Sequence, residues 1–165
     1  GITTEMRQVS QALGLRVLAE TDADRLTEAL PRLKNNVPHR AILRAFHFVD
    51  ETARVQDAVA ALERDDVGAF LEDLVASGES SWKLLQNLYV PGSDNQEMPL
   101  ALEMSRRMLA GHGAWRIHGG GFAGTILAFV PLDMLDNYRA RMDAVFGAGA
   151  TVALSIRPEG AVVIR

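Results

Sequence analysis

A glycine-rich run lies between two stretches that the sequence predicts to be strands. Residues 119–124 read Gly-Gly-Gly-Phe-Ala-Gly, and the predicted strands are residues 114–118 and 125–130. Glycine is used where φ is positive or where another group comes close to the main chain. Successive main-chain N–H groups in such a turn can converge on an anion, so the run indicates a site for a phosphate or a similar group. A merely tight connection between two strands is the alternative.

The glycine run formally matches the dinucleotide-binding pattern G-x-G-x-x-G through Gly119, Gly121 and Gly124. That fingerprint needs a helix directly after the loop. Here the loop leads into apolar and β-branched residues, which favour a strand. No Gly-Lys-Ser/Thr follows, so the sequence excludes both a Rossmann loop and a P-loop. The large side chain of Phe122 could fold back into a core and fix the shape of the loop.

A second group of polar residues lies along the longest predicted helix, residues 39–64. Its members are spaced three and four residues apart: Arg44, His47, Glu51 and Arg54. Side chains at these spacings are neighbours on a helix, so we expect an ion-pair network centred on Glu51 with a structural role. The simpler interpretation is a solvated face with exposed salt bridges. An apolar stripe runs beside it, formed by Phe48, Thr52, Val55, Val59 and Leu62.

The residues of this chain do not form a complete active site by themselves. The sequence has no cysteine and no G-x-S-x-G nucleophile motif, and its four histidines lack H-E-x-x-H spacing. We therefore assign no catalytic residue and no metal ligand to it.

Composition narrows the class of protein further. The chain has 165 residues, 48% hydrophobic and 23% charged, which suits one globular domain. A net charge of -4 gives no general attraction for nucleic acid or anionic lipid. The sequence contains no apolar run long enough to span a bilayer. We expect a cytoplasmic protein with neither nucleic acid nor membrane as a partner.

The predicted elements form a helical first half followed by β-β-α-β-β. The predicted helices are residues 5–13, a short one beginning at Asp22 or Asp24, 39–64, one capped at residues 65–66, one beginning at residues 80–81, and one that ends near 110. Gly78 is expected to break the fourth of these, and Asp94 and Glu97 have capping-box spacing for the sixth. A helix at 132–146 and a hairpin of strands 151–156 and 161–164 follow. The pattern predicts an α+β fold, with a helical first half packed on a small four-stranded antiparallel sheet.

Two segments resemble the GHMP sugar kinases, and galactokinases in particular. Residues 113–125 are similar to the third signature of that superfamily, which in galactokinases usually reads Gly-x-Arg-Met-Thr-Gly-Gly-Gly-Phe-Gly-Gly. Residues 44–54 are similar to the galactokinase pattern Arg-Ala-x-His-x-x-x-Glu-x-x-Arg. The likeness extends over nearly the whole chain. It implies the C-terminal domain of a GHMP kinase, with a ferredoxin-like sheet.

The resemblance implies that residues 1–165 are a fragment of a longer two-domain kinase, without its N-terminal ATP- and sugar-binding half. Such enzymes transfer the γ-phosphoryl group of Mg-ATP to the anomeric hydroxyl of galactose, which gives galactose 1-phosphate. The family's third motif lies close to the substrate and its phosphate, and here it comprises His118, Gly119, Gly120, Gly121, Phe122, Ala123 and Gly124. We expect the fragment to be inactive alone, to bind no ATP or Mg²⁺, and to self-associate through its exposed domain interface.

Some residues depart from the family pattern and leave the sugar open. His118 stands where threonine is usual, and Ala123 replaces a glycine. Because alanine disfavours a positive φ, we expect the turn to be rearranged at Ala123. The alternatives are a GHMP kinase that acts on another sugar, such as an N-acetylhexosamine, a non-catalytic sugar sensor, and a free-standing ligand-binding or dimerisation module. Fold alone does not decide among them.

Overall fold

The computed structural model describes residues 1–122, 124–156 and 158–160. It divides into two compact units, Gly1–Val130 and Pro131–Arg165. Within the described residues, no helix is long and apolar enough to cross a membrane.

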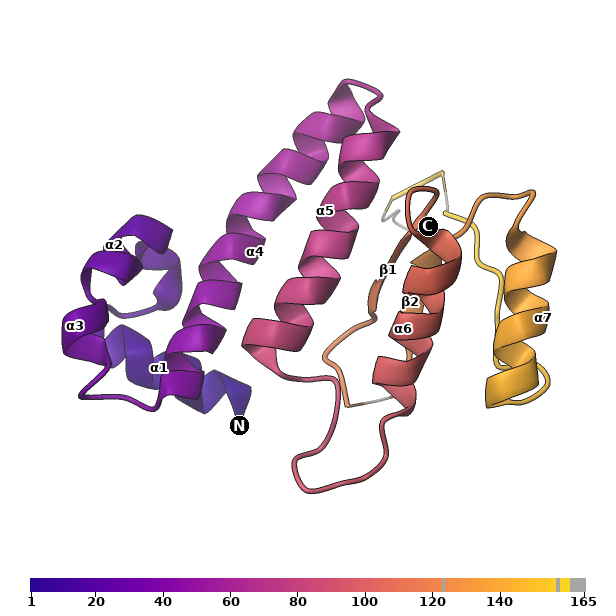
Figure 1. Ribbon diagram of the computed structural model, residues 1–165. Coiled ribbons are helices and arrows are strands. Elements are labelled where there is room, and N and C mark those ends of the chain that lie inside the picture. Colours follow the sequence, from indigo (N-terminus) through magenta and orange to yellow (C-terminus); the bar gives the residue numbers. More distant parts are fainter. Residues whose placement is uncertain (123, 157, 161–165) are drawn as a thin grey trace, which may run out of the picture. The chain divides into compact units, whose positions relative to one another are not determined.

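The first unit begins with short helices that pack against a long one. Their order is α1 (Ile2–Leu13), the 3₁₀ turn η1 (Leu18–Glu20), α2 (Ala23–Glu28), α3 (Leu30–Leu33) and α4 (His39–Glu63) (Figure 1). Gly14 ends α1 with φ 75°, and the Asp22 side chain caps α2 by accepting a hydrogen bond from the Arg25 N–H at 2.9 Å. Both boundaries follow the sequence signals.

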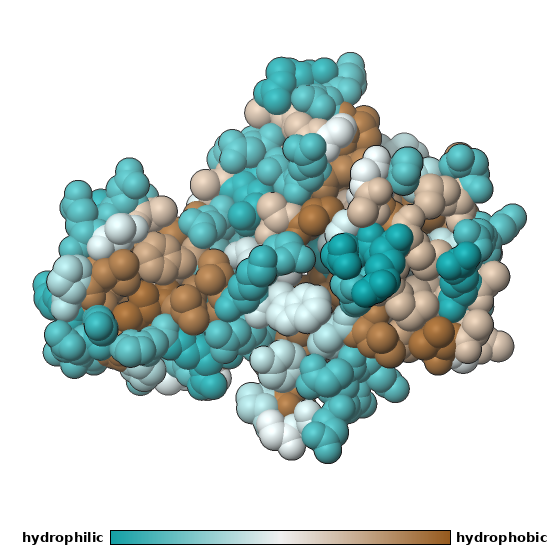
Figure 2. Space-filling view, viewed as in Figure 1, coloured by the Kyte–Doolittle hydropathy of each residue, from teal (hydrophilic) through white to brown (hydrophobic). Residues whose placement is uncertain are grey.

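These helices enclose a hydrophobic core between them. Its buried residues are Val9, Leu18, Leu26, Leu33, Ala41, Ile42, Ala45 and Val49. On the face drawn in Figure 2, hydrophobic residues also gather over α1–α3. Helix α4 contacts α1, η1 and α2, and it also contacts the elements that follow it in the sequence, residues 67–80 and 81–85.

Helix α5 (Val67–Ser80) is longer than the sequence predicts and continues directly into the π-helical turn η2 (Ser81–Leu85). The expectation that Gly78 breaks the helix is wrong. Gly78 lies inside α5, where the helix approaches the strand β1 (Ala114–Ile117). A Cβ atom added there would lie 2.9 Å from the Trp115 carbonyl oxygen. The glycine is therefore used for close packing and not for a change of chain direction.

A two-stranded antiparallel sheet completes the first unit. Helix α6 (Glu97–Leu109) precedes strands β1 (Ala114–Ile117) and β2 (Ile126–Phe129), and β1 contacts both α5 and α6 (Figure 1). The predicted capping box of α6 is wrong, because its N-cap residue is Gln96 and the Gln96 side chain makes no capping hydrogen bond. Instead the Asn95 side chain accepts a hydrogen bond from the Glu97 N–H at 3.1 Å, just before the helix.

The second unit contains α7 (Leu135–Phe146), which begins three residues later than expected. After it, the Asp143 carboxylate accepts hydrogen bonds from the N–H groups of Gly149 and Thr151 at 3.1 and 2.9 Å. Residues 151–156 form no strand in the described structure, and the expected partner strand 161–164 lies outside the described residues. The helical domain with a small antiparallel sheet is confirmed, whereas the four-stranded sheet is not.

The polar stripe of α4 is not solvated as a whole, and the apolar stripe is not covered as a whole. Arg44 and His47 are buried, whereas Val55, Val59 and Leu62 are exposed. These polar side chains face α5 and η2. His47 contacts the Ser80 hydroxyl of α5, and Arg44 donates a hydrogen bond to the Leu85 carbonyl oxygen of η2. The interpretation of Arg44 and His47 as part of a solvated face is therefore wrong.

Candidate functional site

The glycine loop between β1 and β2 has an unusual main chain. The angle φ is positive at Gly119 (68°), Gly121 (75°), Phe122 (58°) and Gly124 (79°). A positive φ is strained for a residue with a Cβ atom, so something must hold Phe122 in this conformation. Its side chain is 47% exposed, and the expectation that it folds back into a core is wrong. Ala123, where a rearranged turn is expected, lies outside the described residues.

The loop presents hydrogen-bond donors to its surroundings. At its base the His118 N–H donates to the Thr125 carbonyl oxygen at 3.1 Å, which continues the hairpin by one step. In the part of the chain that the structure describes, no group accepts a hydrogen bond from the N–H of Gly119, Gly120 or Gly121. Both Gly119 and Gly120 are exposed. This arrangement can receive an anion.

Asn87, which the sequence reasoning missed, holds the far end of the loop. Its side-chain Nδ2 donates to the Gly120 carbonyl oxygen at 3.2 Å, and its own carbonyl oxygen accepts from the Phe122 N–H at 3.0 Å. Asn87 follows η2 in the sequence and is 33 residues away from Gly120. No spacing rule connects two such distant segments.

A groove of about 520 Å³ is lined by residues of both the glycine loop and α4. Gly120 forms part of its lining, together with His47 and Glu51 from α4 and with Leu85 from η2. Residues from α1, among them Met6, line its other side. Two of the four residues of the polar stripe therefore meet the predicted glycine loop at one groove.

Glu51 and His47 make separate contacts to α5. Glu51 forms an ion pair with Arg54, and it accepts a hydrogen bond from the Ser77 hydroxyl at 2.5 Å. The His47 Nδ1 lies 2.8 Å from the Ser80 Oγ. Burial lowers the pKa of His47, although the nearby Glu51 acts in the opposite direction. His47 is therefore held neutral, and a neutral imidazole can donate one hydrogen bond and accept another.

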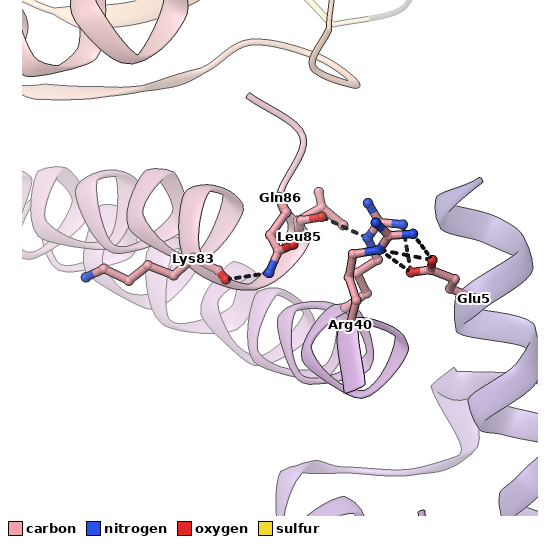
Figure 3. Close-up of polar contacts among 6 residues, drawn as sticks. Glu5, Arg40, Lys83, Leu85 and Gln86 are labelled. Carbon is pink, nitrogen blue, oxygen red and sulfur yellow. Dashed lines mark hydrogen bonds and ion pairs between the residues drawn. The ribbon is translucent and has the colours of Figure 1, made fainter. Parts of the chain in front are cut away.

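Arg44 is not part of a network around Glu51. Its guanidinium is 7% exposed; Nη1 lies 2.8 Å from the Glu5 carboxylate, and Nε donates to the Leu85 carbonyl oxygen at 2.9 Å. Arg40 contacts the same carboxylate at 2.5 Å (Figure 3). Hydrogen bonding to Arg40, aided by the charge of Arg44, lowers the pKa of Glu5. Arg44 thereby ties α1 and α4 to the end of η2, immediately before Asn87.

His47 should make the stability of the protein depend on pH. Because its pKa is lowered in the folded state, the unfolded chain binds its proton first as pH falls below about 6.5. The contribution of neutral His47 is thus complete above that pH and is lost on acidification through the lowered folded pKa. We expect His47→Asn, which keeps a polar group near Ser80, to cost about 1–2 kcal/mol at pH 7.5. Between pH 7 and pH 5, the free energy of unfolding of the His47→Asn variant should also decrease less than that of the wild type.

Urea unfolding at a series of pH values measures this difference. His112→Asn is the matched control, because His112 is exposed. The groups that act on His47 are Glu51, Arg54, Arg116 and Asp50, and they are unchanged in both variants. Equal pH dependence in the wild type and in the His47 variant would contradict the assignment.

Among the described residues, no group of three or more His, Asp or Glu side chains could hold a metal ion.

The comparison with solved structures defines the class of fold. A crystal structure of Lactococcus lactis galactokinase complexed with galactose matches with a TM-score of 0.72 at 22% sequence identity. The match covers 88% of this chain and 37% of that chain. The chain therefore has a galactokinase-like fold. No family model matches the chain.

Curated galactokinases match the sequence itself. Those of Haemophilus influenzae and Actinobacillus pleuropneumoniae are 28% and 26% identical to it, each over 82% of this chain. The galactokinase of Mannheimia succiniciproducens is 31% identical over 60% of it. The resemblance to galactokinases that rested on two motifs is confirmed, since galactokinase homologues cover most of the chain. The chain spans about a third of the length of the first two of these relatives.

Proposed function

We propose that residues 1–165 are the C-terminal domain of a galactokinase-type kinase, with the four-stranded sheet expected from the sequence. The full-length protein is proposed to transfer the γ-phosphoryl group of Mg-ATP to the anomeric hydroxyl of galactose. The observation that supports this best is the galactokinase homology over 82% of the chain, which includes the glycine loop. Among the described residues, the N–H groups of Gly119, Gly120 and Gly121 have no hydrogen-bond acceptor. A cytoplasmic location is part of the proposal.

The glycine loop is proposed to act through its main chain. Phosphoryl transfer depends mainly on positioning and on stabilising charge, so N–H donors near the transferred group can contribute without a catalytic side chain. The N–H groups of Gly119, Gly120 and Gly121 would donate to oxygen atoms of the phosphoryl group or of the sugar. The group that activates the sugar hydroxyl would come from the part of the relatives that this chain does not cover. The isolated chain is proposed to be inactive, to bind no Mg-ATP and to self-associate.

A kinase that acts on another sugar is the second candidate. His118 is exposed at the start of the loop, where galactokinases usually have threonine. An imidazole there is larger than a threonine side chain and can both donate and accept hydrogen bonds. It would therefore change the contacts that a sugar makes at this point.

Gly120 offers a direct test of whether substrate approaches the loop. Its φ is not positive, and a Cβ atom added there would meet no atom within 4 Å. Alanine should therefore leave stability unchanged. If a substrate lies against the loop, the methyl group would displace it, and we expect kcat/KM to fall about tenfold or more. The measurement is phosphoryl transfer by the full-length protein with Mg-ATP and a panel of sugars, with thermal unfolding of the same variant.

Each outcome of the panel separates the candidates. Turnover of galactose by the full-length protein, with none by residues 1–165 alone, supports the galactokinase proposal. Turnover of a different sugar keeps the kinase and changes its acceptor. Sugar binding without turnover supports a sensor. Full activity of Gly120→Ala would contradict a close approach of substrate to the loop.

A further inference from the structure

Asn87 is placed by a sharp local turn after η2. The Gln86 N–H donates to the Ser81 carbonyl oxygen at 2.8 Å, and Gln86 then adopts φ 58° and ψ 53°. Asn87 itself is only 1% exposed, and so is the next residue, Leu88. The carbonyl oxygen of Leu85, the residue before this turn, accepts a hydrogen bond from the buried Arg44. Asn87 is therefore a buried residue whose position is set by the turn before it.

Asn87 contacts the glycine loop through its side-chain amide and through its main-chain carbonyl, and both groups bond to the main chain of the loop. The side-chain amide donates to the Gly120 carbonyl, and the main-chain carbonyl accepts from the Phe122 N–H. These two bonds flank Gly121 on either side. A Cβ atom at Gly121 would lie 2.3 Å from the Asn87 carbonyl oxygen and 2.6 Å from its Nδ2. The contact is thus possible only with glycine at this position, whose φ of 75° also favours glycine.

The orientation of the Asn87 amide follows from its partner. The Gly120 carbonyl only accepts hydrogen bonds, so the NH₂ end must face it, and a flipped amide would place two oxygen atoms together. The Asn87 Oδ1 is buried and has no hydrogen-bond partner among the described residues. A buried amide that leaves one atom unsatisfied is costly.

We propose that Asn87 is a positioning residue that fixes the conformation of the glycine loop. It holds Phe122 at a positive φ and directs the carbonyl of Gly120 inward, which leaves the N–H groups of Gly119, Gly120 and Gly121 for a ligand. The effect on the loop is independent of any activity. Its consequence for catalysis rests on the proposed phosphoryl transfer.

Asn87→Asp is the variant that tests the hydrogen bond itself. The carboxylate cannot donate to the Gly120 carbonyl, whereas the protonated acid can. In this variant we expect the Phe122 amide, whose N–H is bonded to the Asn87 carbonyl oxygen, to exchange at least tenfold faster than in the wild type at pH 8. Lowering the pH should restore wild-type protection, measured at each pH against the wild type. Asn35→Asp is the control, because Asn35 is exposed and only loosely bonded to the Pro31 carbonyl at 3.4 Å.

The wild-type chain provides a second measurement in case the variant does not fold. Its Phe122 amide should exchange slowly, because its N–H is bonded to Asn87 although its side chain is exposed. Fast exchange of this amide in the wild type, or unchanged exchange of the Phe122 amide in a folded Asn87→Asp variant, overturns the proposal.

The activity of the full-length protein gives an independent readout. Asn87→Asp should lower kcat about tenfold at pH 8 and regain activity, relative to wild type, as pH falls. A pH-independent loss overturns the catalytic consequence. If the wild-type protein phosphorylates no sugar, the proposed function fails, and amide exchange still decides whether Asn87 holds the loop.

Discussion

Gly78→Ala is expected to destabilise the protein by about 2–3 kcal/mol, although alanine is the better helix former. Gly78 lies inside α5, and the added Cβ atom would lie 2.9 Å from the Trp115 carbonyl oxygen. It would also lie 3.1 Å from the Cα and Cβ atoms of Arg116. These are mostly main-chain atoms of β1 and cannot rotate away. Either α5 or β1 must shift, and the buried packing between them is lost.

Gly68→Ala in the same helix is the matched control. The nearest atom to a Cβ added at Gly68 is the Asp66 Oδ1 at 3.6 Å, an ordinary contact distance. The substitution removes backbone entropy from the unfolded chain and should change the free energy of unfolding by about 0.5 kcal/mol in the stabilising direction. Urea unfolding of both variants measures the difference. If Gly78→Ala is as stable as Gly68→Ala, α5 does not approach β1 as closely as described.

Local signals in the sequence predicted much of the fold. Gly14 and Asp22 mark the end of α1 and the start of α2, and the long helix α4 follows from its periodicity. These features depend on a few neighbouring residues. Gly78 was misread because the same residue type serves two purposes, ending a helix or permitting close packing. The choice depends on β1, which lies more than thirty residues further along the chain.

The candidate site was predicted only where its residues carry their own signal. The glycine loop was found because positive φ values need glycine, and the structure has them at three glycines of the run. The buried state of Arg44 and His47 could not be predicted from α4 alone. It requires partners from η2 and α5, namely the Leu85 carbonyl and the Ser80 hydroxyl. Asn87 was missed for the same reason, since its role exists only when two distant segments meet.

Arg44→Met should be the second strongly destabilising change, with a loss of about 3 kcal/mol. The Arg44 guanidinium is buried and joins Glu5 on α1 to the Leu85 carbonyl at the end of η2. Methionine fills much of the space but leaves that carbonyl without its donor. Glu5 keeps its contact with Arg40, so its charge is not left without a partner.

Arg40→Met tests whether burial, and not charge pairing alone, sets this cost. Arg40 contacts the same carboxylate at 2.5 Å, but its side chain is 50% exposed, so its loss should cost much less than the loss of Arg44. Arg44→Lys should lie between the two, since an ammonium group lacks the planar fork that reaches two acceptors. Urea unfolding gives all three values. Equal losses for Arg40→Met and Arg44→Met would contradict the idea that Arg44 is the residue that joins α1 and α4 to η2.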